Sequence, residues 1–190
     1  ELARMIKRAG ILFTRLPDEE FDQDLMGEYT GAGVIFGVTG GVMEAALRTV
    51  HFVLTGKEHE AIKFEQVRGF EGVREASIEL AGMTVNVAIA HGMKNAKVLL
   101  DDIRAGKSKY HFIEIMGCPG GCINGGGQPF LHGDTALLEK RMKGLYSEDE
   151  RKVIRCSHNN PDIKALYAEF LGEPGSEKAH HLLHTHYHSK

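Results

Sequence analysis

The sequence predicts an α/β fold, in which a parallel-sheet lobe flanked by helices is followed by an all-helical C-terminal extension. Strand-like apolar runs alternate with helical patterns over residues 1–133, which is the order of a parallel sheet with crossover helices. Residues 134–190 carry helical patterns alone. The 190 residues, 42% of them hydrophobic, suffice for one packed domain with such an extension.

Composition narrows the class of partner. The chain has 23 Lys and Arg against 26 Asp and Glu, so no charge excess points to nucleic acid or to a membrane surface. No apolar run approaches the roughly 20 residues that a membrane span needs. We therefore expect no nucleic acid and no membrane span, and instead a small molecule, a cofactor or a protein partner.

The first residues, "ELARMIKRAG", have the pattern of the middle of an amphipathic helix, with Leu2, Met5 and Ile6 on one side. We therefore expect an upstream part of the protein, including any targeting signal, to be missing from this chain. The expected location is the cytoplasm, and the periplasm stays open because a signal would lie upstream.

The first half of the lobe predicts a strand, a turn and a helix. After an acidic, turn-rich surface connection, the apolar "GVIF" at 33–36 is typical of a strand end. A glycine-rich turn leads into a helix over 42–54, which Gly56 ends. The polar connection that follows, 56–69, has room for a short edge strand.

The second half of the lobe predicts a crossover unit. Residues 72–80 and 84–92 have strand composition, and the uniform Val, Ala and Ile content of the second run favours a parallel strand buried on both faces. A helix over 93–105 and a strand over 109–118 complete the unit. In the extension we expect four short helices, each preceded by a cap or turn: Asp134, Ser147, "NNP" and "GEPGS".

The segment "MGCPGGCINGGGQP", residues 116–129, is called the cysteine loop here. It follows a strand and holds Cys118 and Cys122 in a C-x3-C spacing around Gly120 and Gly121. Open parallel sheets bind cofactors at such strand ends, and glycines let backbone N–H groups approach an anionic group. A thiolate-ligated iron–sulfur cluster is one such group. The alternatives are a redox disulfide and a plain glycine-rich connection.

The number of thiols restricts the iron–sulfur hypothesis. A cubane takes four thiolates or close substitutes, and the cysteine loop offers two. The third cysteine, Cys156, is better interpreted as a small half-buried hydrophobe near a helix end. The other ligands would therefore come from the upstream part or from another subunit.

Residues 30–46, "TGAGVIFGVTGGVMEAA", are called the glycine segment here. Glycines between a strand and a helix are typical of an anion cradle, although the segment has no Walker motif. Close packing of backbone is an equally good explanation. The C-terminal histidines, His180 to His188, are expected to form an exposed tail, and His91 and His111 to be structural. The direction in which Glu114 faces stays open.

Three segments, "FGVTGGVMEAALRT", "HFIEIMGCPGGCINGGGQP" and "LLHTHYHSK", together resemble the C-terminal part of the catalytic domain of iron-only hydrogenases, including the small-subunit-like helical extension. The resemblance covers essentially the whole chain. It implies a two-lobed α/β domain with an H-cluster between the lobes, in which a 4Fe–4S cubane is joined to a two-iron subcluster with CO, cyanide and dithiolate ligands.

The resemblance also implies roles for particular residues. Cys118 would ligate the cubane, and Cys122 would bridge the cubane and the two-iron unit. Met116 would lie against the two-iron unit, and Phe36 and Gly37 would line its pocket. These residues would serve the reversible reduction of protons to dihydrogen.

The chain lacks the first two signature segments of that family, which supply the other cubane cysteines. The resemblance therefore implies, as partners, an upstream part or a separate large subunit, a ferredoxin or an NAD(P)-oxidising subunit, and maturation proteins. The fragment alone is expected to be inactive. Gly117 stands where most relatives are expected to have alanine. The alternative is a hydrogenase-like iron–sulfur assembly factor without hydrogenase activity.

Overall fold

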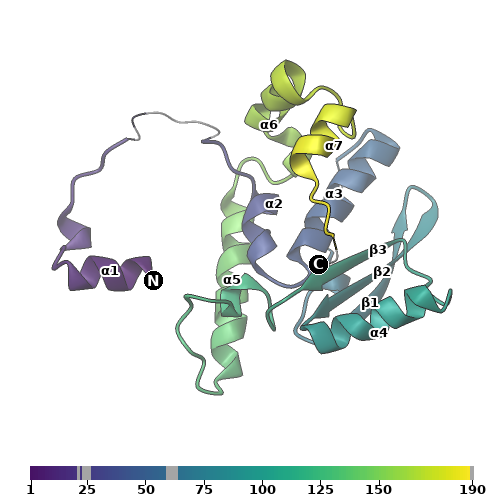
Figure 1. Ribbon diagram of the computed structural model, residues 1–190. Coiled ribbons are helices and arrows are strands. Elements are labelled where there is room, and N and C mark those ends of the chain that lie inside the picture. Colours follow the sequence, from purple (N-terminus) through teal and green to yellow (C-terminus); the bar gives the residue numbers. More distant parts are fainter. Residues whose placement is uncertain (21, 23–26, 59–63, 189–190) are drawn as a thin grey trace.

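The computed structural model describes residues 1–20, 22, 27–58 and 64–188 (Figure 1). Its centre is a three-stranded sheet in the order β1–β2–β3. Strand β1, Val73–Leu80, pairs antiparallel with β2, Met83–His91, and β2 pairs parallel with β3, Phe112–Met116. The predicted α/β class and the parallel crossover from β2 to β3 are therefore confirmed.

The described residues also form α-helices in both parts of the chain. In the lobe they are α1 Leu2–Arg8, α2 Gly31–Val34, α3 Gly41–Thr55 and α4 Met93–Arg104. In the extension they are α5 Thr135–Arg151, α6 Pro161–Leu166 and α7 Glu177–Leu183. Single-turn helical segments occur as well, at Phe13–Arg15, Ile35–Gly37, Glu65–Val67, Cys122–Asn124, Ser157–Asn159 and Tyr167–Leu171.

The second half of β2, from Val87 to His91, is buried because α3 and α4 cover its opposite faces (Figure 1). Successive side chains of a strand point to opposite sides. Val87 and Ile89 accordingly join the core that includes the α3 side chains, whereas Ala88 and Ala90 pack with Leu99 of α4. The uniformly apolar run that predicted a doubly buried strand reflects this sandwich.

The β1–β2 hairpin was not predicted from the sequence. Its two-residue turn consists of Ala81 and Gly82, which both have positive φ, at 52° and 79°. Positive φ at both central residues matches the right-handed twist of paired strands. The turn therefore sets the antiparallel pairing of β1 with β2.

The strand expected at 33–36 is wrong, because these residues lie in helical turns. Thr30 caps α2 by accepting a hydrogen bond from the Gly33 N–H at 3.0 Å. The free N–H groups of Gly31 and Ala32 donate to backbone carbonyls of the extension, at 2.9 Å each. Capping and these distant contacts outweigh the local apolar run. Of the edge strand suggested within 56–69, residues 59–63 lie outside the described residues, and residues 65–67 form a helical turn.

The prediction that a helix starts at Ser147 is also wrong. Helix α5 runs without interruption through that residue to Arg151, because the buried Tyr146 and Asp149 on either side of it face the lobe. The other predicted starts are confirmed. Asp134 caps α5, Asn160 caps α6, and Ser176 caps α7. In the described extension the α-helices number three and not four.

Helix α5 and the lobe share one core. Leu138 and Tyr146 of α5 pack with Ile35, Val38 and Ile123, which lie on the two glycine-rich loops of the lobe. No described helix is long and apolar enough to cross a bilayer.

A buried network of charged side chains joins α3 to α5. Arg48 of α3 is 1% exposed and donates two hydrogen bonds to Asp149 of α5, at 2.8 and 2.9 Å. Arg48 also donates to Glu44, one helical turn away, at 2.8 Å. Arg68 donates to Glu44, and Arg155 donates to Asp149. Each buried carboxylate is thus held by two guanidinium groups.

Asp149 is ionised at neutral pH. Burial alone would raise its pKa, but the hydrogen bonds from Arg48 and Arg155 outweigh burial and hold the pKa below its usual range. A carboxyl group whose pKa is lowered by folding stabilises the folded state above its unfolded pKa. That stabilisation is lost as the pH falls through the folded pKa.

We predict that Asp149→Ala destabilises the protein by about 3–5 kcal/mol, because the buried Arg48 would lose its main counter-charge. The measurement is the free energy of urea unfolding at pH 7. The control is Asp101→Ala, which removes exposed ion pairs with Lys97 and Arg104 and is expected to leave stability unchanged. Equal effects of the two substitutions would contradict the prediction.

Candidate functional site: the cysteine loop

The cysteine loop leaves β3 at Met116 and folds back on itself. The Gly121 N–H donates to the Cys118 carbonyl at 2.9 Å, and Cys122 begins a single helical turn. Gly120 and Gly121 have φ of 82° and 88°, a region in which a side chain is strained. Cys118 and Cys122 are both free thiols with exposed side chains. The loop therefore presents two thiols on the surface at the carboxyl end of a parallel strand.

The structure brings the cysteine loop and the glycine segment into backbone contact. The Thr39 N–H donates to the Gly120 carbonyl at 3.1 Å. A Cβ on Gly121 would lie 2.9 Å from both the Gly37 carbonyl oxygen and the Thr39 nitrogen, closer than real Cβ contacts come. Gly37, Gly120 and Gly121, which were singled out in separate motifs, thus belong to one site.

The two apolar candidates, Met116 and Phe36, lie close to the contacting glycine residues along the chain. Met116 is the last residue of β3 and is half-buried. Phe36 directly precedes Gly37, and its side chain is 46% exposed. Gly37 lies against α5, because a Cβ there would come within 2.9 Å of a methyl carbon at the end of the Leu145 side chain. The extension therefore supports the glycine segment from behind.

His91, at the end of β2, holds the middle of the cysteine loop. Its Nδ1 accepts a hydrogen bond from the Gly120 N–H at 3.0 Å and lies 3.5 Å from the Thr39 hydroxyl. Nδ1 is therefore unprotonated and the ring proton is on Nε2. Burial lowers the pKa of His91 and favours this neutral form. His91 is a structural histidine, as expected, and its structural role is at the site.

Glu114 in β3 faces the glycine segment, which answers the question that the sequence left open. Its two carboxyl oxygens accept hydrogen bonds from the Gly40 and Met43 N–H groups, at 2.6 and 2.7 Å. These donors are at the start of α3, where N–H groups have no partner within the helix. Burial raises the pKa of Glu114, and the two backbone hydrogen bonds oppose that shift.

Sequence reasoning did not assign this role to Glu114 or identify the contact of His91 with Gly120. The available signal was position: both residues are on strands at the edge from which the cysteine loop departs. A buried polar side chain at such an edge must find a partner, and the nearest backbone is that of the two loops.

The fold and the site together define a class of protein: an α/β lobe that presents two thiols at the end of a strand and packs against a helical extension. Residues 1–126 match the family described as "Iron only hydrogenase large subunit, C-terminal domain", and residues 135–190 match "Iron hydrogenase small subunit". The chain belongs to the iron-only hydrogenase family.

Named relatives agree with this assignment. The chain is 53% identical to the NADP-reducing hydrogenase subunit HndD of Solidesulfovibrio fructosivorans, over 98% of this chain and 32% of that protein. It is 45% identical to iron hydrogenase 1 of Clostridium pasteurianum, over 98% of this chain and 33% of that protein. A solved structure of an FeFe-hydrogenase HydA1 variant from Chlamydomonas reinhardtii has a TM-score of 0.72 and 41% identity, over 98% of this chain and 53% of that one. The chain thus spans about a third of the length of these curated relatives.

We predict that Gly121→Ala destabilises the protein by roughly 1–3 kcal/mol, because φ of 88° and the close backbone of Gly37 leave no place for a methyl group. The matched control is Gly117→Ala in the same loop, where a Cβ would meet open space. The control is expected to be neutral or to stabilise by about 0.4–1 kcal/mol. Thermal unfolding of both variants checks this, and a tolerated Gly121→Ala would refute it.

We predict that Glu114→Gln destabilises by about 1–3 kcal/mol, because an amide NH₂ would face one of the two N–H donors and leave it unpaired. Hydrogen exchange at Gly40 and Met43 should quicken in the same variant. The matched control is Glu79→Gln on the exposed face of β1, which makes the same change at a carboxylate that accepts a hydrogen bond from the Thr84 hydroxyl and from no backbone N–H of the described residues. An equally small effect at both positions would show that the carboxylate of Glu114 is not needed.

Proposed function

We propose that this chain forms the C-terminal part of the catalytic domain of an iron-only hydrogenase that interconverts protons, electrons and dihydrogen. The observation that carries the proposal is the pair of free, exposed thiols of Cys118 and Cys122 at the carboxyl end of β3. Family membership adds iron–sulfur cofactors, including the H-cluster, to what the site is expected to hold. In this proposal residues 1–133 are a lobe of that domain, and residues 134–190 are its helical small-subunit-like extension.

The residues present fit such a group. Cys118 would be a ligand of the 4Fe–4S cubane, and Cys122 would bridge it to the two-iron subcluster with its CO, cyanide and dithiolate ligands. The soft thiolates suit iron–sulfur chemistry, and two of them leave further ligands to the upstream part or to a large subunit. When bound, the H-cluster supplies the electron transfer and the reduction of protons.

The chain's own residues would hold and shield that group. Met116 and Phe36 are apolar and flank the joined loops, so they would exclude water from the two-iron unit. Gly120 and Gly121 would act through the shape of the loop, because their N–H groups are already bonded to His91 and to the Cys118 carbonyl. Gly37 would allow the glycine segment to approach closely.

The proposal includes the partners that an incomplete site requires. Electrons would come from ferredoxin or from an NAD(P)-oxidising subunit, and maturation proteins would insert the two-iron unit. The name of the relative HndD, an NADP-reducing hydrogenase subunit, supports a multi-subunit context. We place the protein in the cytoplasm, although another relative, 50% identical over 84% of this chain and 38% of that protein, is named a periplasmic hydrogenase large subunit.

A second candidate function is iron–sulfur cluster assembly without hydrogen chemistry. The observation that favours it is a 32% identity to cytosolic iron-sulfur assembly component 3 of Rattus norvegicus, over 80% of this chain and 32% of that protein. The hydrogenase relatives are more similar, at 53% and 45% identity, so hydrogenase activity is the primary proposal.

We predict that the full-length protein, produced anaerobically with the two-iron maturation proteins, evolves dihydrogen from reduced viologen. Cys122→Ser should abolish this activity, because serine offers a harder oxygen in place of the bridging thiolate. Gly117→Ala in the same loop is the matched control and should keep the activity, since its side chain would meet open space.

Two outcomes would contradict the proposal. A full-length protein that is loaded with iron–sulfur clusters and makes no dihydrogen would favour the assembly function. A Cys122→Ser variant that is as active as the parent would exclude the bridging role of that residue.

A further inference from the structure

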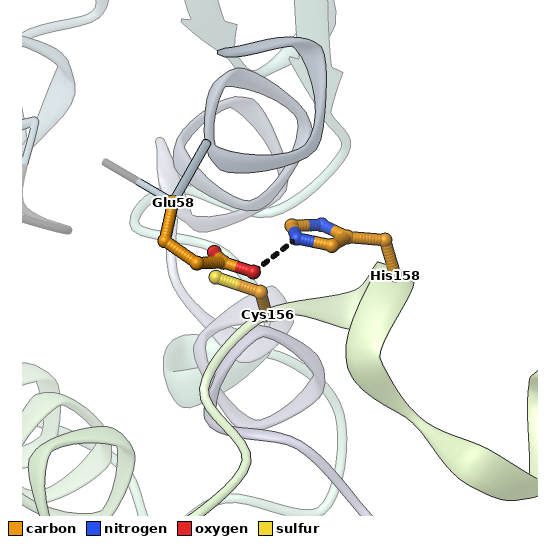
Figure 2. Close-up of side chains that lie close together, drawn as sticks. All are labelled: Glu58, Cys156 and His158. Atoms are coloured by element: carbon orange, nitrogen blue, oxygen red, sulfur yellow. Dashed lines mark hydrogen bonds and ion pairs between the residues drawn. The ribbon is translucent and has the colours of Figure 1, made fainter. Parts of the chain in front are cut away.

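A second group of metal-ligating side chains lies outside the cysteine loop. Among the described residues, Glu58, Cys156 and His158 place a carboxylate oxygen, a thiol sulfur and an imidazole nitrogen within 4.8 Å of one another (Figure 2). Glu58 follows α3, and the other two residues precede α6 in the extension. The group therefore forms where the lobe meets the extension.

The three side chains are held in place before any ligand binds. The His158 ring stacks on Phe52 with centroids 4.3 Å apart, and its Nδ1 lies 3.2 Å from the Thr49 hydroxyl. This leaves Nε2 directed at the Glu58 carboxylate, 3.0 Å away. Asn159 donates to the same carboxylate at 2.7 Å. Partners of this kind around the first ligands set the ring orientation and tautomer of histidines that bind metals.

A nucleophilic role for Cys156 fits the geometry poorly. The residue is 3% exposed, and burial together with Glu58 raises the pKa of its thiol to about 11. The thiol is therefore protonated at neutral pH, whereas nucleophilic cysteines have lowered pKa values and partial exposure. The imidazole that would act as base is already paired with Glu58. A bound cation would change the state of the thiol, because the cation takes the place of the thiol proton and binds the sulfur as a thiolate.

We propose that Glu58, Cys156 and His158 form a zinc site that fastens the extension to the end of α3. Thiolate, imidazole and carboxylate are the donors that Zn²⁺ binds in proteins. The proposal uses no residue of the cysteine loop and stands apart from the proposed hydrogenase function.

The distances between the three donor atoms suit a zinc ion if the side chains move slightly inward. Because the three donor atoms lie within 4.8 Å of one another, an ion placed among them would lie at most about 2.8 Å from each, and inward side-chain shifts below 1 Å would give zinc distances of about 2.0–2.3 Å. A water molecule would be the fourth ligand of a tetrahedral zinc ion at these three side chains.

Binding requires a defined movement of protons. Zinc takes the lone pair of His158 Nε2, so the ring proton moves to Nδ1 and is donated to the Thr49 hydroxyl. The Cys156 thiol loses its proton to solvent as the zinc–sulfur bond forms. Near neutral pH each zinc should therefore release about one proton, and affinity should increase with pH.

The test uses the full-length protein with its iron–sulfur clusters loaded, incubated with ZnCl₂ and desalted. Metal analysis should find one tightly held zinc per chain, and zinc-edge X-ray absorption should find one sulfur at about 2.3 Å beside nitrogen and oxygen ligands. Cys156→Ser should lose both the sulfur signal and the tight binding. Asn159→Ala, which keeps all three ligands, should weaken binding by roughly 10–100-fold.

Glu58→Gln covers the case in which Cys156→Ser does not fold, because the Glu58 side chain is 44% exposed and its removal leaves the core intact. This variant should also bind zinc more weakly. His184→Ala is the matched control for the histidine-rich tail and should leave binding unchanged. The proposal is overturned by zinc without a sulfur ligand, by unchanged binding in Cys156→Ser and Glu58→Gln, or by loss of zinc in His184→Ala.

Discussion

The architecture depends on the buried ion pair between Arg48 and Asp149. Both side chains are fully buried, so neither charge can be left without the other, and α3 and α5 must meet at this point. The pairing also dictates smaller features. A Cβ on Gly31 would lie 2.0 Å from the Asp149 carboxylate, so the first residue of α2 has to be glycine. The extension is therefore an integral part of the packing around the lobe.

Buried charges of this kind specify one arrangement of the chain more sharply than apolar contacts do. Arg48 divides its donors between Glu44, Asp149 and the Arg155 carbonyl. One of its donors, Nε, has no partner among the described residues, which opposes part of the gain. The network fixes the register of three segments at once, because a shift of one turn in any of them would leave a charge unpaired.

Buried polar side chains also fix the chain near the cysteine loop, where single residues do so in place of a network. Glu114 ties the start of α3 to β3, and His91 ties Gly120 to β2. Both anchors originate on rigid strands and end on backbone groups of the two loops. The loops thereby acquire a defined shape although glycine makes them intrinsically permissive. Two exposed thiols on such a supported loop are well arranged for a rigid cofactor.

The sequence by itself determined the elements whose signal is local: the helix that ends at Gly56, the doubly buried β2, the crossover to β3, and the caps at Asp134, Asn160 and Ser176. It also determined the cysteine loop, whose motif is contiguous. Tertiary structure alone decided that 33–36 is helical, that α5 continues through Ser147, that Glu114 faces the glycine segment, and that Cys156 meets Glu58 and His158. These features depend on partners far away in the chain, as in the pairing of Arg48 with Asp149 across 101 positions. Periodicity and propensity describe neighbours within a few residues, so contacts at that separation leave no trace in them.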